Sequence, residues 1–275
     1  MKVLVPFDFS EEAKHALRFG NELSSQLNLE LKVLHALGLS DFPYYKTNAL
    51  DTIPDKVEKA ANHELKTVLT DELGGVDRVH FEIGHKGATR EILKTMRTEE
   101  ISFTVLGYKD FEVPEKVGST TKDILRHAEG SVLCLKKPLS LSHVKTVLFV
   151  SDFQNTPTKA MGNIKKLVKA AGASLRFLYV NSRANWLSTN EVLSRFYQFC
   201  SVHDIVDREI EIVNEETVDM GVVHYVNRNP VDIIGLKIGR ESSKIDMAHA
   251  HLSAERILSH TDIPLLTYAH ESRYL

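Results

Sequence analysis

The sequence predicts an α/β protein of two tandem domains. Each is an open five-stranded parallel sheet of Rossmann-like type with helices on both faces, and the two pack as an intrachain pseudo-dimer. The first observation behind this prediction is a repeat. Residues 3–10, Val-Leu-Val-Pro-Phe-Asp-Phe-Ser, return as residues 147–154, Val-Leu-Phe-Val-Ser-Asp-Phe-Gln, and the offset of 144 persists through the next two expected elements. The second is that short apolar runs alternate with helical patterns in both halves, which is typical of parallel sheets.

The first half begins with a strand followed by a helix. Residues 2–7 form a short apolar run that ends at a turn, and Asp8 or Ser10 can cap the helix that follows. The further elements expected in this half are strands at residues 31–37, 79–83, 102–106 and 131–135, and helices at residues 55–73, 89–96 and 120–127. Because a parallel neighbour needs a long return path, strands separated by helices predict parallel pairing with right-handed crossovers.

The second half repeats this order of elements. Its strands are expected near residues 146–151, 175–180, 208–213, 231–235 and 264–268. We place the domains at residues 1–138 and 144–275, with a linker so short that the halves should pack together. Ser131–Leu135 and Ile263–Thr267 are apolar strands at the ends of their sheets, and pairing them would cover two open edges. A pseudo-dimer within one chain is therefore expected, and a homodimer of the whole chain is left open.

The composition is that of ordinary folded domains, and it argues against several classes of protein. With 275 residues, 43% of them apolar, each half is long enough to bury its own core. A net charge of −3 without a Lys/Arg stripe argues against nucleic-acid binding. No apolar run approaches membrane-spanning length, so we expect no membrane association and a cytoplasmic location. Cys134 and Cys200 have neither metal-ligand nor disulfide spacing and are expected to be reduced thiols.

A ligand crevice is expected where the strands end, because doubly wound sheets bind ligands beyond the carboxyl ends of their strands. In the first half Asp8, Ala36 and Gly107 follow the first, second and fourth strands, and Gly118-Ser119-Thr120 begins the last helix. A glycine followed by hydroxyl residues at a helix start offers free backbone N–H groups and side-chain donors, which suit a phosphate.

Three segments of the chain resemble the universal stress protein family. They are the opening Val-Leu-Val-Pro-Phe-Asp-Phe-Ser, the strand ending Val33-Leu34-His35-Ala36, and the closing Val105-Leu106-Gly107 … Gly118-Ser119-Thr120-Thr121-Lys122-Asp123-Ile124-Leu125-Arg126-His127. Start and end motifs occur in both halves, so the resemblance covers almost the whole chain and is to the tandem, two-domain members. It implies an open five-stranded fold of the adenine nucleotide alpha hydrolase-like class, pairing through the last strands, and stress-response regulation more than a catalysed reaction.

The family divides into a class that binds ATP or another adenine nucleotide and a class that does not. The binding class carries the pattern G-x2-G-x9-G-S/T. In the first half Gly107 fits the first position, Asp110 stands in the second, and Gly118-Ser119 follows two residues too early. A carboxylate in a phosphate cradle costs Coulomb energy unless a metal ion bridges it. In the second half Gly235 fits the first position, but His251 and Leu252 replace the closing Gly-Ser.

The resemblance therefore implies an adenine-nucleotide site (ATP or AMP) that is degenerate and confined to the first half. The residues that it implies for this site are Asp8, Ala36, Gly107, Gly118, Ser119 and Thr120. Their vestigial counterparts in the second half are Asp152 and Gly235.

Several of these residues also have a purely structural interpretation. By the resemblance Asp8 lies on the adenine and ribose side of the pocket, but an aspartate there can also act as the N-cap of the next helix. For Asp152 we expect capping, because the second half lacks the rest of the site. Gly107 and Gly235 can serve as positions of positive φ where the chain leaves a strand, and Ser119 can serve as a helix cap.

The sequence shows no established catalytic or metal-binding pattern, and we expect no catalytic residues. It has no nucleophile elbow and no complete Walker A pattern, and Ser10 and His35 lie where the fold places crevice groups for other reasons. His249 and His251 form a His-x-His pair that can supply two nitrogens to Zn²⁺. A stable zinc site needs further ligands, so solvated or capping histidines are expected instead.

Three functional hypotheses follow, each from a different class. The first is a regulatory stress protein that acts on an unknown protein partner, with any adenine-nucleotide site in its first half. The second is a true nucleotide sensor whose affinity depends on the glycines of residues 107–118. The third is a weak ATPase. Retained nucleotide separates the first from the second, and turnover separates the second from the third.

Overall fold

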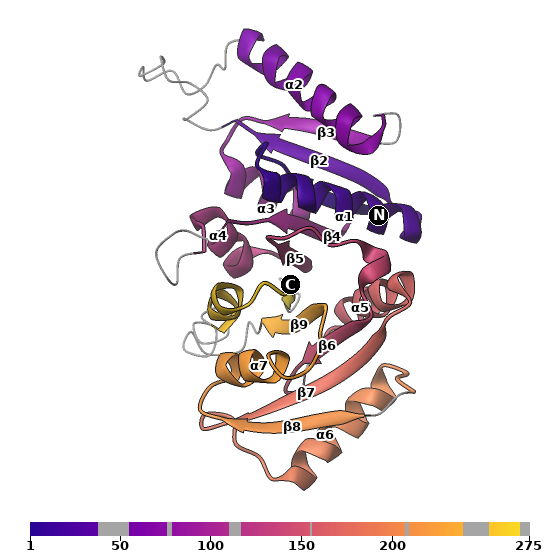
Figure 1. Ribbon diagram of the computed structural model, residues 1–275, viewed down its shortest axis with the longest axis vertical. Helices are drawn as coiled ribbons and strands as arrows, with labels where there is room; N and C mark the ends of the chain where they lie inside the picture. The colour runs from indigo at the N-terminus through magenta and orange to yellow at the C-terminus, as the bar shows by residue number, and fades with distance from the viewer. Residues whose placement is uncertain are drawn as a thin grey trace.

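The described strands form one sheet, and helices cover both of its faces (Figure 1). The computed structural model describes residues 1–37, 55–75, 79–109, 117–154, 156–206, 209–238 and 253–269. Within these ranges the elements follow one another as the sequence predicts, and their ends differ from the expected ones by a few residues.

Strands and helices alternate in both halves. The elements of the first half are β1 (Lys2–Pro6), α1 (Glu11–Leu27), β2 (Glu30–Ala36), α2 (Asp55–Leu73), β3 (Val79–Gly84), α3 (Ala88–Thr98), β4 (Ile101–Gly107), α4 (Ser119–His127) and β5 (Ser131–Leu135). The linker contains a short 3-10 helix, η2 (Leu141–His143). The labelled elements of the second half are β6 (Thr146–Val150), α5 (Thr158–Ala171), β7 (Ser174–Ser182), α6 (Thr189–Val202), β8 (Ile210–Glu215), α7 (Val218–Val226), β9 (Ile233–Ile238) and β10 (Leu265–Ala269). Residues 253–260, which we call the last helix, are also helical.

The strand order in the described sheet is β3-β2-β1-β4-β5-β10-β9-β6-β7-β8, so each half has the same internal order. Strands within a half pair in parallel. The two halves meet through β5 and β10, which pair antiparallel with Leu266 opposite Leu133. The predicted pairing of the two edge strands is therefore confirmed, and it joins two five-stranded sheets into one.

Each face of the sheet has its own apolar core, and each core draws residues from both halves. One face is covered by α1, α2, α5 and α6, which contribute Leu17, Leu65, Ile164 and Phe196 among others. The other face is covered by α3, α4, α7 and the last helix, which contribute Ile92, Ile124, Val222 and Ile257. Burying one such side chain contributes about 1.5–3 kcal/mol, so these faces supply the main driving force for folding.

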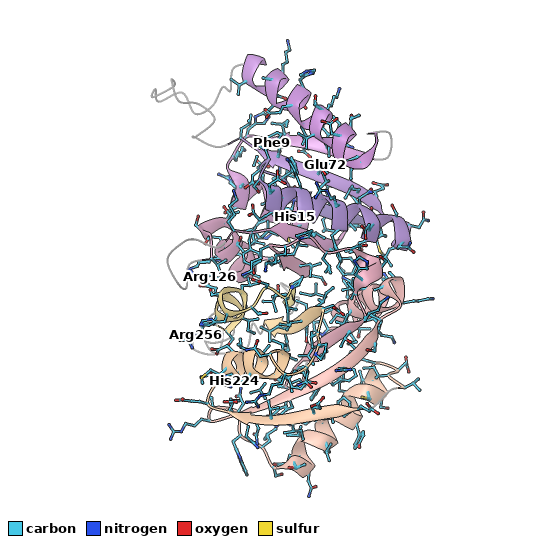
Figure 2. The ribbon with its side chains drawn as sticks, viewed as in Figure 1. Phe9, His15, Glu72, Arg126, His224 and Arg256 are labelled. Carbon is cyan, nitrogen blue, oxygen red and sulfur yellow. The ribbon has the colours of Figure 1, made fainter. Side chains whose placement is uncertain are left out.

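Polar contacts between the halves supplement the strand pairing. The Tyr108 hydroxyl donates to the Leu258 carbonyl at 3.1 Å, and Asn163 Nδ2 donates to the Ser102 carbonyl at 2.8 Å. The Asn163 contact lies on the face of α5, and on the other face, beside the Tyr108 contact, Arg126 of α4 reaches Glu255 of the last helix at 2.7 Å. Figure 2 shows Arg126 beside this junction. The halves are thus held together on both faces.

Both cysteines are buried and neither forms a disulfide, as the sequence predicts. Burial raises the pKa of the Cys134 thiol to about 12, so this side chain behaves as an apolar core residue. Among the helices of the described residues, none is both long and apolar enough to span a bilayer.

Candidate functional site

The candidate site of the first half begins at the loop between β1 and α1. Ser10 is the N-cap of α1, and its hydroxyl accepts from the Ala13 N–H at 3.2 Å. Asp8 lies two residues earlier and accepts from the Ser10 N–H at 3.1 Å and from the Ser10 hydroxyl at 2.5 Å. Of the two caps that the sequence allowed, Ser10 is therefore the right one. Asp8 does not cap the helix but orients the residue that does.

Asp8 remains open to solvent in this arrangement. The residue is exposed, and both of its hydrogen bonds use the same carboxylate oxygen, Oδ1. Within the described part of the chain, no partner is recorded for the other oxygen, Oδ2. The carboxylate can therefore accept a hydrogen bond from a ligand hydroxyl without giving up its structural role.

The backbone at Phe9 is left-handed, with a φ of 64°. The Phe9 ring packs edge-on against His35, with 4.7 Å between ring centroids, and against Phe7. His35 Nδ1 lies 2.7 Å from the Phe7 carbonyl, so this nitrogen carries the proton and donates. The histidine thus fixes the loop between β1 and α1. Ser10 and His35 therefore each have a structural role in this loop.

Gly107 ends β4 directly beneath the first turn of α1. A Cβ atom there would lie 2.2 Å from the Glu12 carbonyl oxygen and 2.6 Å from the Ala13 nitrogen. The expectation of a positive φ is wrong, because Gly107 is not in the left-handed region. The glycine is instead required by the close approach of the helix. Gly235 is not left-handed either, and a Cβ atom there would have ordinary contacts from 3.5 Å outward.

Helix α4 starts at Ser119 with Gly118 as its N-cap. The suggested cap at Ser119 is wrong, because Ser119 is the first helical residue and Gly118, which makes no side-chain cap bond, holds the N-cap position. The first N–H groups of an α-helix lack partners within the helix, so this turn and the Thr120 hydroxyl can donate to an anion. Asp110, which the sequence places in this loop, lies outside the described residues.

The structure brings together three of the predicted strand ends. In the sheet, β1 lies between β2 and β4, so the ends marked by Asp8, Ala36 and Gly107 are neighbours along one edge. Ala36 pairs with Gly84 of β3 on its other side. The helix start at Gly118 follows β4 on the opposite face of the sheet from α1, which is the arrangement of a doubly wound crevice.

The second half keeps the backbone of this site but changes its side-chain contacts. Phe153 repeats the left-handed conformation of Phe9 with a φ of 58°. Asp152, the counterpart of Asp8, accepts from the Gln154 N–H at 3.1 Å. The expectation that Asp152 caps a helix is wrong, because α5 begins at Thr158 after Pro157.

A lysine from β9 fills the position beside Asp152. Lys237 Nζ lies 3.2 Å from Asp152 Oδ1 and donates to the Gln154 carbonyl at 2.5 Å, and the Lys237 side chain is only 8% exposed. Tyr179, at the position of His35, donates its hydroxyl to the Asn185 carbonyl at 2.7 Å. Burial raises the pKa of Tyr179, which keeps this hydroxyl a neutral donor. Sequence reasoning missed the role of Lys237, although the alignment of Lys237 with Lys109 could have pointed to it.

The two histidines considered as metal ligands, His249 and His251, lie outside the described residues. Over the ranges that are described, no group of three His, Cys, Asp or Glu side chains could hold a metal ion.

Strand order, crevice position and repeat together define a tandem of two doubly wound α/β domains. The profile of the universal stress protein family matches residues 1–136. The first half of the chain therefore belongs to the universal stress protein family. No curated protein sequence matches the chain.

Solved structures extend the likeness to the whole chain. A universal stress protein from Archaeoglobus fulgidus is similar over 98% of both chains, with a TM-score of 0.73 and 17% sequence identity. A protein of unknown function from Pseudomonas aeruginosa is similar over 98% of this chain and 92% of its own, with a TM-score of 0.69 and 13% identity. At such low sequence identities the likeness shows the fold alone, and it covers both halves of the chain.

Proposed function

We propose that this protein is a regulatory stress-response protein that acts through a protein partner and holds one adenine nucleotide, in its first half. The observation that carries the proposal is the difference between the two aspartates. Asp8 is exposed and accepts hydrogen bonds from the neutral groups of Ser10, whereas Asp152 is half-buried and paired with a buried lysine. A ligand hydroxyl would find an acceptor in the first half and a neutralised group in the second.

The residues of the first half fit such a ligand in part. Asp8 would accept from a ribose hydroxyl, and the glycine at position 107 lets the helix start approach the strand end. The open helix start at Gly118 and Ser119 would donate backbone N–H groups to phosphate oxygens. This combination supports ATP or AMP more than an uncharged ligand.

Titration of nucleotide-free protein with a fluorescent ATP analogue tests the proposal. Asp8→Asn should weaken binding about tenfold, because the amide keeps the shape but loses the charge-assisted hydrogen bond. Asp152→Asn, the matched change in the second half, should leave the affinity unchanged. Equal affinities for the wild type and Asp8→Asn, or a loss caused by Asp152→Asn, would contradict the assignment of the site.

Catalysis is not part of the proposal. The Ser10 hydroxyl serves as a helix cap and His35 Nδ1 donates to the Phe7 carbonyl, so structural roles account for both residues without the alternative of a weak ATPase. Because β5 and β10 already cover each other, a homodimer would need another surface. A cytoplasmic location, without membrane or nucleic-acid partners, completes the proposal.

A further inference from the structure

The lysine that follows the glycine of the fourth strand behaves differently in the two halves. In the second half Lys237 turns inward and bonds Asp152 and the Gln154 carbonyl. In the first half the equivalent Lys109 is 61% exposed and lies 3.6 Å from Glu12. The same residue type at the same place in the fold therefore has two arrangements.

The sequence offset explains which acceptors each lysine can choose. Asp8 and Asp152 are equivalent, so each lysine has a carboxylate at the end of the first strand of its half. Glu12, however, is replaced in the second half by Thr156. Only the first half thus has a second carboxylate, in the first turn of its helix, that competes for the lysine.

Glu12 is stabilised by its contact with Lys109. Its Oε2 atom is buried and, among the described residues, makes no hydrogen bond. A buried carboxylate oxygen without a donor is costly unless a cation lies nearby, and Lys109 is the cation recorded there. Turning Lys109 towards Asp8 would leave this oxygen without a neutralising charge.

We propose that Glu12 keeps the crevice of the first half open by holding Lys109 away from Asp8, and that Lys237 closes the crevice of the second half from within. The choice of Glu or Thr at this one aligned position then determines which half accepts a ligand. For the identity of that ligand, a nucleotide with a ribose hydroxyl and phosphates, this inference rests on the proposed function. The arrangement of the lysines does not depend on it.

The first test needs no ligand. Brief acetylation of the intact protein, followed by peptide mass spectrometry, measures how accessible each lysine amine is. We expect Lys237 to react about tenfold more slowly than Lys109, because its amine is buried and bonded. In Glu12→Thr the reaction of Lys109 should slow about fivefold as the amine turns to Asp8. Glu11→Thr removes a neighbouring acid that pairs with Lys14, and should leave Lys109 unchanged.

The second test uses the same variants in a titration with the fluorescent ATP analogue. Glu12→Thr should weaken binding about tenfold, and the double variant Glu12→Thr with Lys109→Ala should bind more tightly than Glu12→Thr alone. If the wild type binds no nucleotide, the proposed function fails while the acetylation result still decides the arrangement of the lysines. Lys109 reacting as fast in Glu12→Thr as in the wild type would overturn the inference, as would a Lys237 that reacts as fast as Lys109.

Discussion

At the scale of single residues, the two halves share a strained turn and differ in what surrounds it. Phe9 and Phe153 both have positive φ, a conformation that costs a residue with a side chain about 1–2 kcal/mol. Because the half with a paired aspartate keeps it as well, the strain belongs to the shared turn and not to a ligand. The two halves differ at Glu12 and Thr156, and this difference determines where the lysine of each half lies.

The glycines at positions 107 and 235 provide a prediction with a built-in control. Gly107→Ala should destabilise the protein by about 2 kcal/mol, since the new Cβ atom would meet the backbone of Glu12 at 2.2 Å and force α1 to shift. Gly235→Ala should change stability by less than about 0.5 kcal/mol, because its Cβ atom has room. Neither glycine is left-handed, so backbone strain does not confuse the comparison. Urea unfolding of both variants measures the difference.

Two outcomes of that comparison would contradict the packing described for α1. One is a Gly107→Ala protein as stable as the wild type. The other is an equal loss of stability in both variants, which would point to a general intolerance of alanine at this strand position.

At the scale of elements, the strand pair β5 and β10 makes the chain one molecule. Both strands are fully buried where described, and each would be an apolar edge without the other. The interhelix ion pairs of the buried Glu255 with the partly exposed Lys122 and Arg126 support the same junction.

Separate expression of residues 1–138 and 144–275 tests this role of the strand pair. We expect each half to self-associate, and the two to form a complex when mixed. Each half alone would expose an apolar edge strand whose backbone groups can pair with another chain. Size-exclusion chromatography with light scattering measures the masses. Two folded halves that stay monomeric and show no affinity for each other would contradict the pseudo-dimer.

At the scale of the whole molecule, the sequence was sufficient for the architecture but not for the chemistry of the site. The alternation of apolar runs and helical patterns depends on local periodicity, and the pairing of residues 131–135 with the last strand follows from edge strands that must be covered. The cap at Ser10 and the contact of Lys237 with Asp152 depend on side-chain geometry instead. Asp8 and Ser10 both suit a cap by type, and no sequence pattern tells which way a lysine turns.

The central claim is that this molecule has one nucleotide site, in its first half. Heat denaturation of the purified protein, followed by chromatography of the supernatant, measures any AMP, ADP or ATP that it retains, and titration of nucleotide-free protein with ATP measures what it can bind. We predict a stoichiometry that approaches one nucleotide per chain and does not exceed it, since Lys237 occupies the second crevice. Two nucleotides per chain, or none retained and none bound, would contradict the claim.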